Sequence, residues 1–126
     1  MSKEASNRLY RSPLKWAGGK RRIVHRIAAL LPKNNTSHLI EPFVGGGSVF
    51  LNLNFDNYTL FDSNPDLISL FNTIKSEPEA LISQANALFT PLNNQSENYY
   101  QIREQFNRTN DSLKRSAMFI YLNRHG

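Results

Sequence analysis

The feature that most constrains this chain is an apolar run broken by three consecutive glycines at residues 39–51, which read LIEPFVGGGSVFL. Such a run predicts a short β-strand, a tight turn and then a helix that continues to about residue 53. A strand that ends at glycines leaves bare backbone at the carboxyl edge of a sheet, and the first N–H groups of a helix attract anions. Open α/β sheets bind nucleotide-like ligands there. The alternative is that the glycines serve only the geometry of the turn.

The length and composition suit a small globular domain, since the chain has 126 residues of which 40% are hydrophobic and 11% aromatic. We expect no membrane association, because no apolar run approaches the roughly 18 residues of a spanning helix. The polar N-terminus lacks the apolar core of a signal peptide, so a cytoplasmic location is expected. With no cysteine there is no disulfide and no thiolate metal site, and no metal ligand set is predicted.

The charge is unevenly distributed. Residues 1–26 hold eight basic residues and one acid, whereas residues 39–100 hold one lysine and seven acids. Residues 101–126 are basic again, with five basic residues and two acids. Clustered lysine and arginine favour a polyanionic partner such as nucleic acid, because phosphates attract them. The alternative is charge that serves only solubility.

The order of predicted elements changes near residue 66. Before it we expect a helix over 20–31, a strand over 38–42, the helix after the glycines, and a second strand over 58–61. The apolar spacing of the first helix predicts a buried face made of Ile23, Val24, Ile27, Leu30 and Leu31. After residue 66 we expect only helices, beginning near residues 65, 77, 97 and 111, and the second of these is expected to point inward with Leu81, Ile82, Ala85, Leu88 and Phe89. Asn64 and Asp111 resemble helix N-caps, and residues 76–79 (SEPE) resemble a capping box. A parallel pair of strands needs both faces covered, so the rest of the sheet is expected outside this sequence.

Two further segments bear on the ligand. Asp62 follows the second strand and stands 17 residues after Gly45, where nucleotide-binding sheets place a carboxylate for ribose hydroxyls. Trp16 and Lys20 flank a Gly-Gly turn and offer an aromatic plate and a cation. This turn is not a phosphate-binding P-loop, because Leu14 occupies the position of its first glycine. The alternatives are an Asx turn or helix cap for Asp62, and a core tryptophan beside a solvated lysine.

Four segments together resemble the Dam-type DNA adenine-N6 methyltransferase family, and the likeness covers the chain from residue 13 on. They read LKWAGGK (residues 14–20), EPFVGGGSVF (41–50), FDSNPDLI (61–68) and YLNRHG (121–126). The resemblance implies an α/β fold: the N-terminal part of a Rossmann-like, S-adenosylmethionine-dependent methyltransferase fold, followed by an inserted helical DNA-recognition domain. The expected domains are 1–68, the partial cofactor domain, and 69–126, the start of the recognition domain.

The resemblance also assigns roles to residues. The family positions that would contact or shape the site of S-adenosyl-L-methionine are Trp16, Lys20, Glu41, Phe43, Gly45, Gly47 and Asp62. Those expected to approach double-stranded DNA are Lys15, Asn123 and Arg124. In this family the target adenine is flipped into a pocket and receives a methyl group on its exocyclic nitrogen.

The family's catalytic D/N-P-P-Y/F tetrapeptide is absent, because the only Asx-Pro pair is Asn64-Pro65 and Asp66 follows it. No catalytic residue is therefore assigned. We expect an N-terminal part of a DNA adenine-N6 methyltransferase that is inactive alone. One alternative is a non-catalytic relic, or half of a split enzyme whose C-terminal half is a second polypeptide. Another is a dinucleotide-binding oxidoreductase domain, although G-x-G-x-x-G would need glycine where Phe50 stands.

Overall fold

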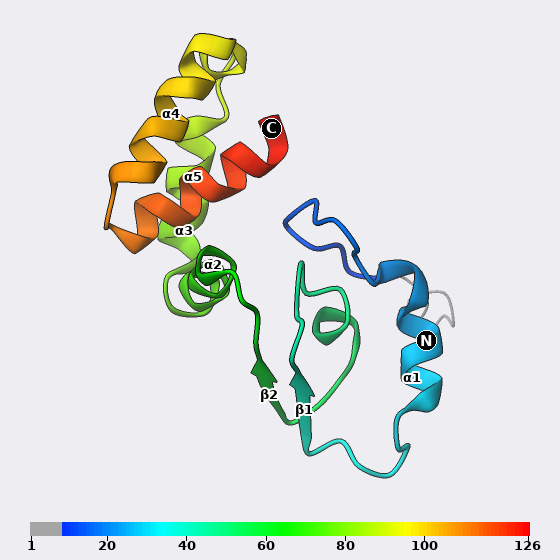
Figure 1. Cartoon of the computed structure of the whole chain (residues 1–126). Helices are drawn as coiled ribbons and strands as arrows, with labels where there is room; N and C mark the ends of the chain where they lie inside the picture. The colour runs from blue at the N-terminus through cyan, green and yellow to red at the C-terminus, as the bar shows by residue number, and fades with distance from the viewer. Residues whose placement is uncertain (1–8) are drawn as a thin grey trace, which may run out of the picture. The chain divides into compact units, whose positions relative to one another are not determined.

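The computed structural model describes residues 9–126, so most of the basic arm expected at residues 1–12 lies outside the described residues. The chain divides into two compact units, Met1–Ser63 and Asn64–Gly126. Both strands belong to the first unit, and helices α2 to α5 belong to the second (Figure 1).

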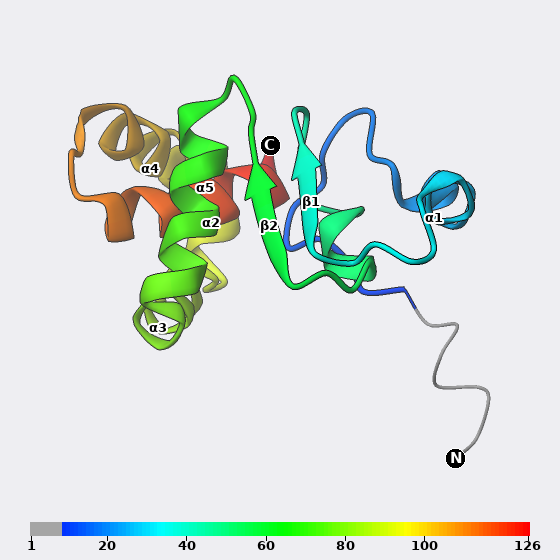
Figure 2. The ribbon, with the colours of Figure 1, turned by 90° about the horizontal axis from the view of Figure 1, so that it is seen from below.

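The first unit is built on a parallel pair of strands, β1 (His38–Glu41) and β2 (Asn57–Leu60). The register pairs His38 with Asn57 and Glu41 with Leu60. Figure 2 shows the two strands side by side with their arrows pointing the same way. Both predicted strands are therefore confirmed to within one residue at each end. Because the strands are parallel, the loops that follow them start from the same edge of the sheet.

The helix predicted after the glycines is wrong. Only a single 3₁₀ turn, η2 (Phe50–Asn52), forms there. The side chain of Asn52 donates from Nδ2 to the carbonyl oxygen of Ser48 at 2.7 Å. That carbonyl would accept the backbone N–H of residue 52 in an α-helix, but this N–H donates to Val49 instead, at 3.0 Å. Local side-chain bonding of this kind competes with the helical ladder. The anion-binding helix terminus expected from the sequence is therefore not formed.

The helix expected over residues 20–31 is shorter than predicted. It starts as a 3₁₀ turn, η1 (Arg21–Ile23), and continues as α1 (Val24–Leu30). Pro32 follows and cannot continue a helix. Of the predicted apolar face only Val24 is buried, whereas Ile23 and Leu30 are 45% and 86% exposed. Ile27 and Leu31 are half-buried, so the prediction of a buried face is wrong at Ile23 and Leu30.

The second unit contains the predicted succession of helices: α2 (Pro65–Ser76), α3 (Pro78–Leu88), the 3₁₀ turn η3 (Leu92–Asn94), α4 (Ser96–Arg108) and α5 (Ser112–His125). The side chain of Asn64 accepts from the first-turn N–H groups of Asp66 and Leu67. Asp111 does the same for α5, at 3.1 Å from the nitrogens of Leu113 and Lys114. Both predicted N-caps are confirmed.

The core of the second unit forms around α5, which packs against α2, α3 and α4 (Figure 1). Tyr121 is fully buried there, and its hydroxyl donates to the carbonyl oxygen of Asn93. Arg115 forms a bidentate ion pair with Asp66, at 2.6 and 3.2 Å, and lies 4.0 Å from the centre of the Phe106 ring. The ion pair joins the first turn of α2 to the start of α5.

Two predictions for α3 are wrong. The capping box is not formed: Ser76 donates from Oγ to the carbonyl of Asn72 at 3.0 Å, and the N-cap position belongs to Glu77, whose side chain makes no capping bond. The predicted inward face is only partly buried: Leu81 and Ala85 are in the core, but Ile82 and Phe89 are 60% and 42% exposed. Periodicity places a residue on a face of a helix, but the width of the buried stripe depends on what packs against it.

Candidate functional site

The loop that follows β1 is held at the carboxyl ends of both strands. The N–H of Phe61 donates to the carbonyl of Glu41 at 2.8 Å, and the N–H of Val44 donates to the carbonyl of Phe61 at 2.9 Å. These two bonds continue the pairing of the strands beyond β1 and β2. The glycine loop is therefore anchored to the sheet on its first side.

The glycines turn the chain and place it against Asp62. Gly45 and Gly47 have φ values of +53° and +87°, in the left-handed region that glycine adopts at little cost. The N–H of Gly45 donates to Oδ2 of Asp62 at 3.1 Å. The glycine turn and the acid predicted from the sequence are thus in direct contact. A carboxylate offers about four lone-pair sites, so it can bond a backbone N–H and ligand hydroxyls together.

Trp16 packs directly on this loop. A Cβ atom built on Gly45 would lie 3.4 Å from Cδ1 of Trp16, and one on Gly46 would lie 3.3 Å from Cβ of Trp16. The Gly46 position is also closed by Ser12, whose Oγ would be 2.9 Å away. The close approach of residues 12–16 to the loop therefore favours glycine at position 46, since a larger residue would displace Ser12 or Trp16.

Lys20 reaches the same loop from the other end of the segment. Its Nζ donates to the carbonyl of Phe43 at 2.6 Å. A turn brings it there: the N–H of Gly19 donates to the carbonyl of Trp16 at 3.2 Å, and Gly18 has a φ of +71°. The tryptophan and the lysine thus lie on the same side of the loop.

These segments enclose a hollow within the first unit. Its cavity volume of about 170 Å³ is more than ten times the roughly 10–15 Å³ that one water molecule needs, so it has room for a larger ligand. It is lined by Trp16, Ala17, Gly18, Gly19, Lys20, Phe43, Val44, Gly45, Gly46, Ser48, Val49 and Asp62.

Glu41 ends β1 and is buried, with 7% of its surface exposed. Its Oε1 has no hydrogen-bond partner among residues 9–126. Burial raises the pKa of this carboxyl above its usual value, and the charge of Lys20 and the N–H of Phe50 partly oppose that effect. An acidic group without a full set of partners thus lies beside the hollow's cation.

The hollow gathers most of the residues singled out as cofactor contacts. Trp16, Lys20, Phe43, Gly45 and Asp62 line it, whereas Glu41 and Gly47 do not. Phe43 is 77% exposed and Gly47 is buried in the turn.

Sequence reasoning missed the neighbours that hold these residues, chiefly Ser12, Ser48 and Asn52. In the sequence these three residues are polar side chains within or beside apolar segments. That pattern does not predict which groups they contact.

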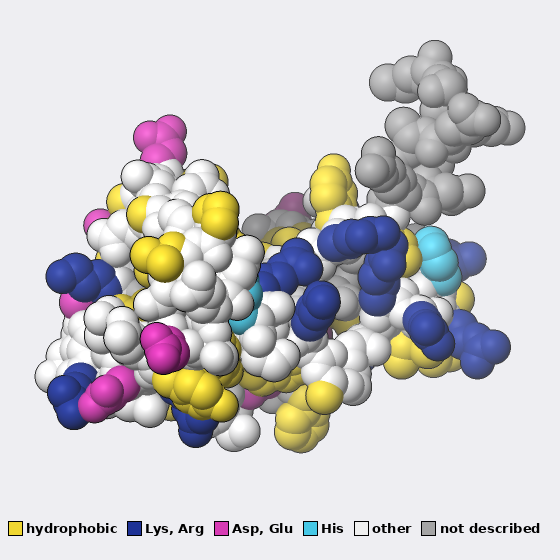
Figure 3. Space-filling model, turned by 90° about the horizontal axis from the view of Figure 1, so that it is seen from above, with side chains coloured by type: hydrophobic (Ala, Val, Ile, Leu, Met, Phe, Trp, Pro, Cys, Tyr) yellow, Lys and Arg dark blue, Asp and Glu magenta, His cyan; other side chains and the backbone are white. Residues whose placement is uncertain are grey.

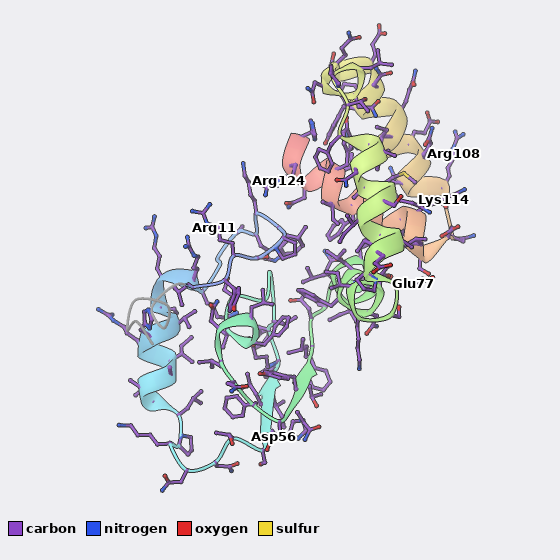
Figure 4. All side chains as sticks on the ribbon, turned by 180° about the vertical axis from the view of Figure 1, so that it is seen from behind. Arg11, Asp56, Glu77, Arg108, Lys114 and Arg124 are labelled. Carbon is purple, nitrogen blue, oxygen red and sulfur yellow. The ribbon has the colours of Figure 1, made fainter. Side chains whose placement is uncertain are left out.

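The residues expected to approach DNA belong to different units. Lys15 is exposed and adjoins Trp16 in the first unit. Asn123 and Arg124 belong to the last turn of α5 in the second unit. Arg124 is exposed (Figure 4), and Asn123 is half-buried.

Among residues 9–126, no three side chains of histidine, aspartate and glutamate cluster as metal ligands would. None of the helices in this part of the chain is both long and apolar enough to cross a lipid bilayer.

Comparison with known proteins agrees with the motifs. A model of the D12 class N6 adenine-specific DNA methyltransferases matches residues 16–126. The chain belongs to this family. It is 51% identical to a DNA adenine methylase of Vibrio cholerae and 49% identical to one of Escherichia coli K12, each over 92% of this chain. A DNA adenine methylase of Serratia marcescens is 46% identical over 91% of it.

Membership in the D12 class confirms the Dam-type resemblance and replaces the oxidoreductase alternative. The chain covers 41% of the length of the Vibrio and Escherichia relatives and 42% of the Serratia relative. The described residues of this D12-class chain combine helices and strands, as an α/β fold requires.

Proposed function

We propose that this chain forms the cofactor-binding part, and the start of the DNA-recognition part, of an adenine-N6 DNA methyltransferase. One observation carries the proposal: three separate family motifs line one hollow, the first through Trp16 and Lys20, the second through Gly45 and the third through Asp62. The proposed fold is the N-terminal part of a Rossmann-like methyltransferase domain, residues 1–68. Residues 69–126 would begin an inserted helical recognition domain.

The side chains of the hollow fit S-adenosylmethionine. Trp16 offers an aromatic face for the adenine ring, Asp62 accepts from ribose hydroxyls, and Lys20 pairs with the carboxylate of the amino-acid part. The glycine backbone lets the cofactor approach without a Cβ in the way. When bound, this cofactor supplies an electrophilic methyl group on a sulfonium.

We propose double-stranded DNA as the partner, with Lys15, Asn123 and Arg124 as contacts. Cations and amides are the groups that proteins use to hold phosphates and base edges. The adenine would be flipped out of the duplex to reach the methyl group. Because the D/N-P-P-Y/F tetrapeptide is not among these 126 residues, the groups that grip the adenine nitrogen would come from further polypeptide.

Cofactor binding is the first test, and the chain carries its own reporter because Trp16 is its only tryptophan. Titration with S-adenosylmethionine should change the Trp16 fluorescence. Asp62→Ala should weaken binding at least tenfold, since hydrogen bonds to a charged group are worth roughly 1.5–3 kcal/mol. Asp56→Ala is the matched control, because Asp56 is exposed and does not line the hollow (Figure 4). Equal binding by the wild-type chain and both variants would overturn the assignment of the hollow.

Methyl transfer is the second test. The purified chain, incubated with duplex DNA and S-adenosylmethionine labelled in its methyl group, should transfer no label. Adding a polypeptide that carries the tetrapeptide and the remaining length of a relative should restore transfer if the two halves assemble. Label in DNA with the 126-residue chain alone would show that the tetrapeptide is dispensable.

A further inference from the structure

Asn52 binds both backbone polar groups of a residue 42 positions away. Its Oδ1 accepts from the N–H of Tyr10 at 2.6 Å, and its Nδ2 donates to the carbonyl of Tyr10 at 3.1 Å. The same Nδ2 donates to the carbonyl of Ser48 at 2.7 Å, in the loop that lines the hollow. A planar amide has both the acceptor and the two donors that this arrangement uses. One side chain thus ties Tyr10 to the end of the glycine loop.

The segment held in this way forms one wall of the hollow. Two residues beyond Tyr10, Ser12 closes the space over Gly46 and accepts at Oγ from the N–H of Leu14 at 3.1 Å. Leu14 is buried, and Trp16 then packs on Gly45 and Gly46. The far end of the segment is fixed by the bond from Lys20 to the carbonyl of Phe43. Trp16 therefore lies between two tethers, of which Asn52 is the first.

We propose that Asn52 is a positioning residue for the cofactor site. By holding Tyr10, it keeps residues 10–16, including Trp16, packed on the glycine loop before the ligand binds. This rests on the proposed function of the hollow. Asn52 does not line the hollow, so it acts through residues 10–16. If the wall is in place only a tenth of the time without the tether, the apparent dissociation constant rises about tenfold.

The test uses Asn52→Asp in the whole chain. Aspartate has the same shape and keeps the acceptor, but it loses both donors and places a charge beside the carbonyls of Tyr10 and Ser48. Asn54→Asp is the matched control, because Asn54 is exposed and two residues away. Asn52→Asp should make Trp16 more accessible to acrylamide quenching and weaken S-adenosylmethionine binding about tenfold. Asn54→Asp should change neither, and far-UV circular dichroism should show the same helix content in both variants.

A double-mutant cycle separates positioning from general destabilisation. Tyr10→Pro changes the other partner of the contact: it removes the N–H of residue 10, which donates to Oδ1 of Asn52. If Asn52 acts through Tyr10, the two substitutions together should weaken binding little more than either alone. Additive effects, or unchanged Trp16 quenching in Asn52→Asp, would overturn the proposal. The quenching readout needs no cofactor, so it still decides the role of Asn52 if S-adenosylmethionine fails to bind the wild-type chain and the proposed function falls.

Discussion

At the scale of single residues, Gly45 contributes to the site through its backbone conformation and its backbone N–H. Its φ of +53° is left-handed, and its N–H is the donor to Asp62. We expect Gly45→Ala to lower the free energy of unfolding of the first unit by about 1–2 kcal/mol, the usual cost of a Cβ in this conformation. Gly45→Asn should cost less, because asparagine tolerates left-handed backbone. Urea unfolding followed by Trp16 fluorescence measures both, and an alanine variant as stable as the asparagine variant would contradict the explanation.

Glu41 gives a prediction about pH. Burial raises the pKa of its carboxyl above the ordinary 4.5. An acid with a raised folded-state pKa contributes stability that is fully present below the unfolded pKa and is lost as pH rises through the folded pKa. The wild-type chain should therefore lose stability relative to Glu41→Gln as pH rises from about 4.5 towards neutral.

Urea unfolding of the two chains at several pH values between 4 and 8 measures this difference. Asp56→Asn is the control, since it removes one carboxylate from an exposed position of the same unit. A constant difference between the wild type and Glu41→Gln across this range would show that Glu41 titrates alike in the folded and unfolded chain.

At the scale of elements, α3 and α5 begin in different ways. The side chain of Asp111 accepts two first-turn N–H groups of α5, whereas the side chain of Glu77, the N-cap of α3, makes no capping bond. We expect Asp111→Ala to lower the free energy of unfolding of the second unit by about 1 kcal/mol, the usual value of an N-cap. Glu77→Ala should change it by no more than about 0.5 kcal/mol, as at an ordinary surface site. Thermal unfolding followed by circular dichroism compares the two, and equal losses would contradict the capping geometry.

The elements that the sequence predicted well are those whose signals are local. Asn64 and Asp111 start helices with their own side chains, and each strand is followed within a few residues by a glycine or an aspartate, Gly45 after β1 and Asp62 after β2. The helix after the glycines was mispredicted because its outcome depends on Asn52, whose amide is held by Tyr10 as well as by Ser48. The buried face of α1 was mispredicted for a similar reason. Periodicity identifies the residues that share a face, but not what the rest of the molecule packs against it.

At the scale of the whole molecule, the sequence could identify the family, and most of the cofactor contacts that it predicted line the hollow, because these residues belong to motifs with a fixed order. It could not show that Trp16 rests on Gly46, or that Asn52 holds Tyr10. Both contacts join segments about 30 to 42 residues apart, so they depend on the path of the chain rather than on spacing. The motifs therefore predict which groups meet the ligand, and the fold reveals which groups hold them.

The charge of the chain also acts at this scale. Residues 5–40 contain eight lysines and arginines and no acid. In the first unit Arg11, Lys15, Arg21, Arg22 and Arg26 are exposed. Figure 3 shows lysine and arginine side chains gathered on the surface of this unit. Because no acidic residue in this stretch offsets the basic side chains, their surface has a positive potential. Such a potential attracts DNA phosphates.

Substitution of three of these arginines tests whether the first unit contacts DNA. Each phosphate contact contributes about 0.9 to the slope of the logarithm of the binding constant against that of the salt concentration. The triple variant Arg21→Gln, Arg22→Gln, Arg26→Gln should therefore lower the slope for a short duplex by up to about 2.7. The variant Lys75→Gln, Arg103→Gln, Lys114→Gln removes the same charge from exposed positions on α2, α4 and α5, and it should lower the slope less. Fluorescence anisotropy of labelled duplex between 50 and 200 mM salt measures both slopes. Equal loss in the two variants would mean that net charge, and not the surface of the first unit, sets the affinity.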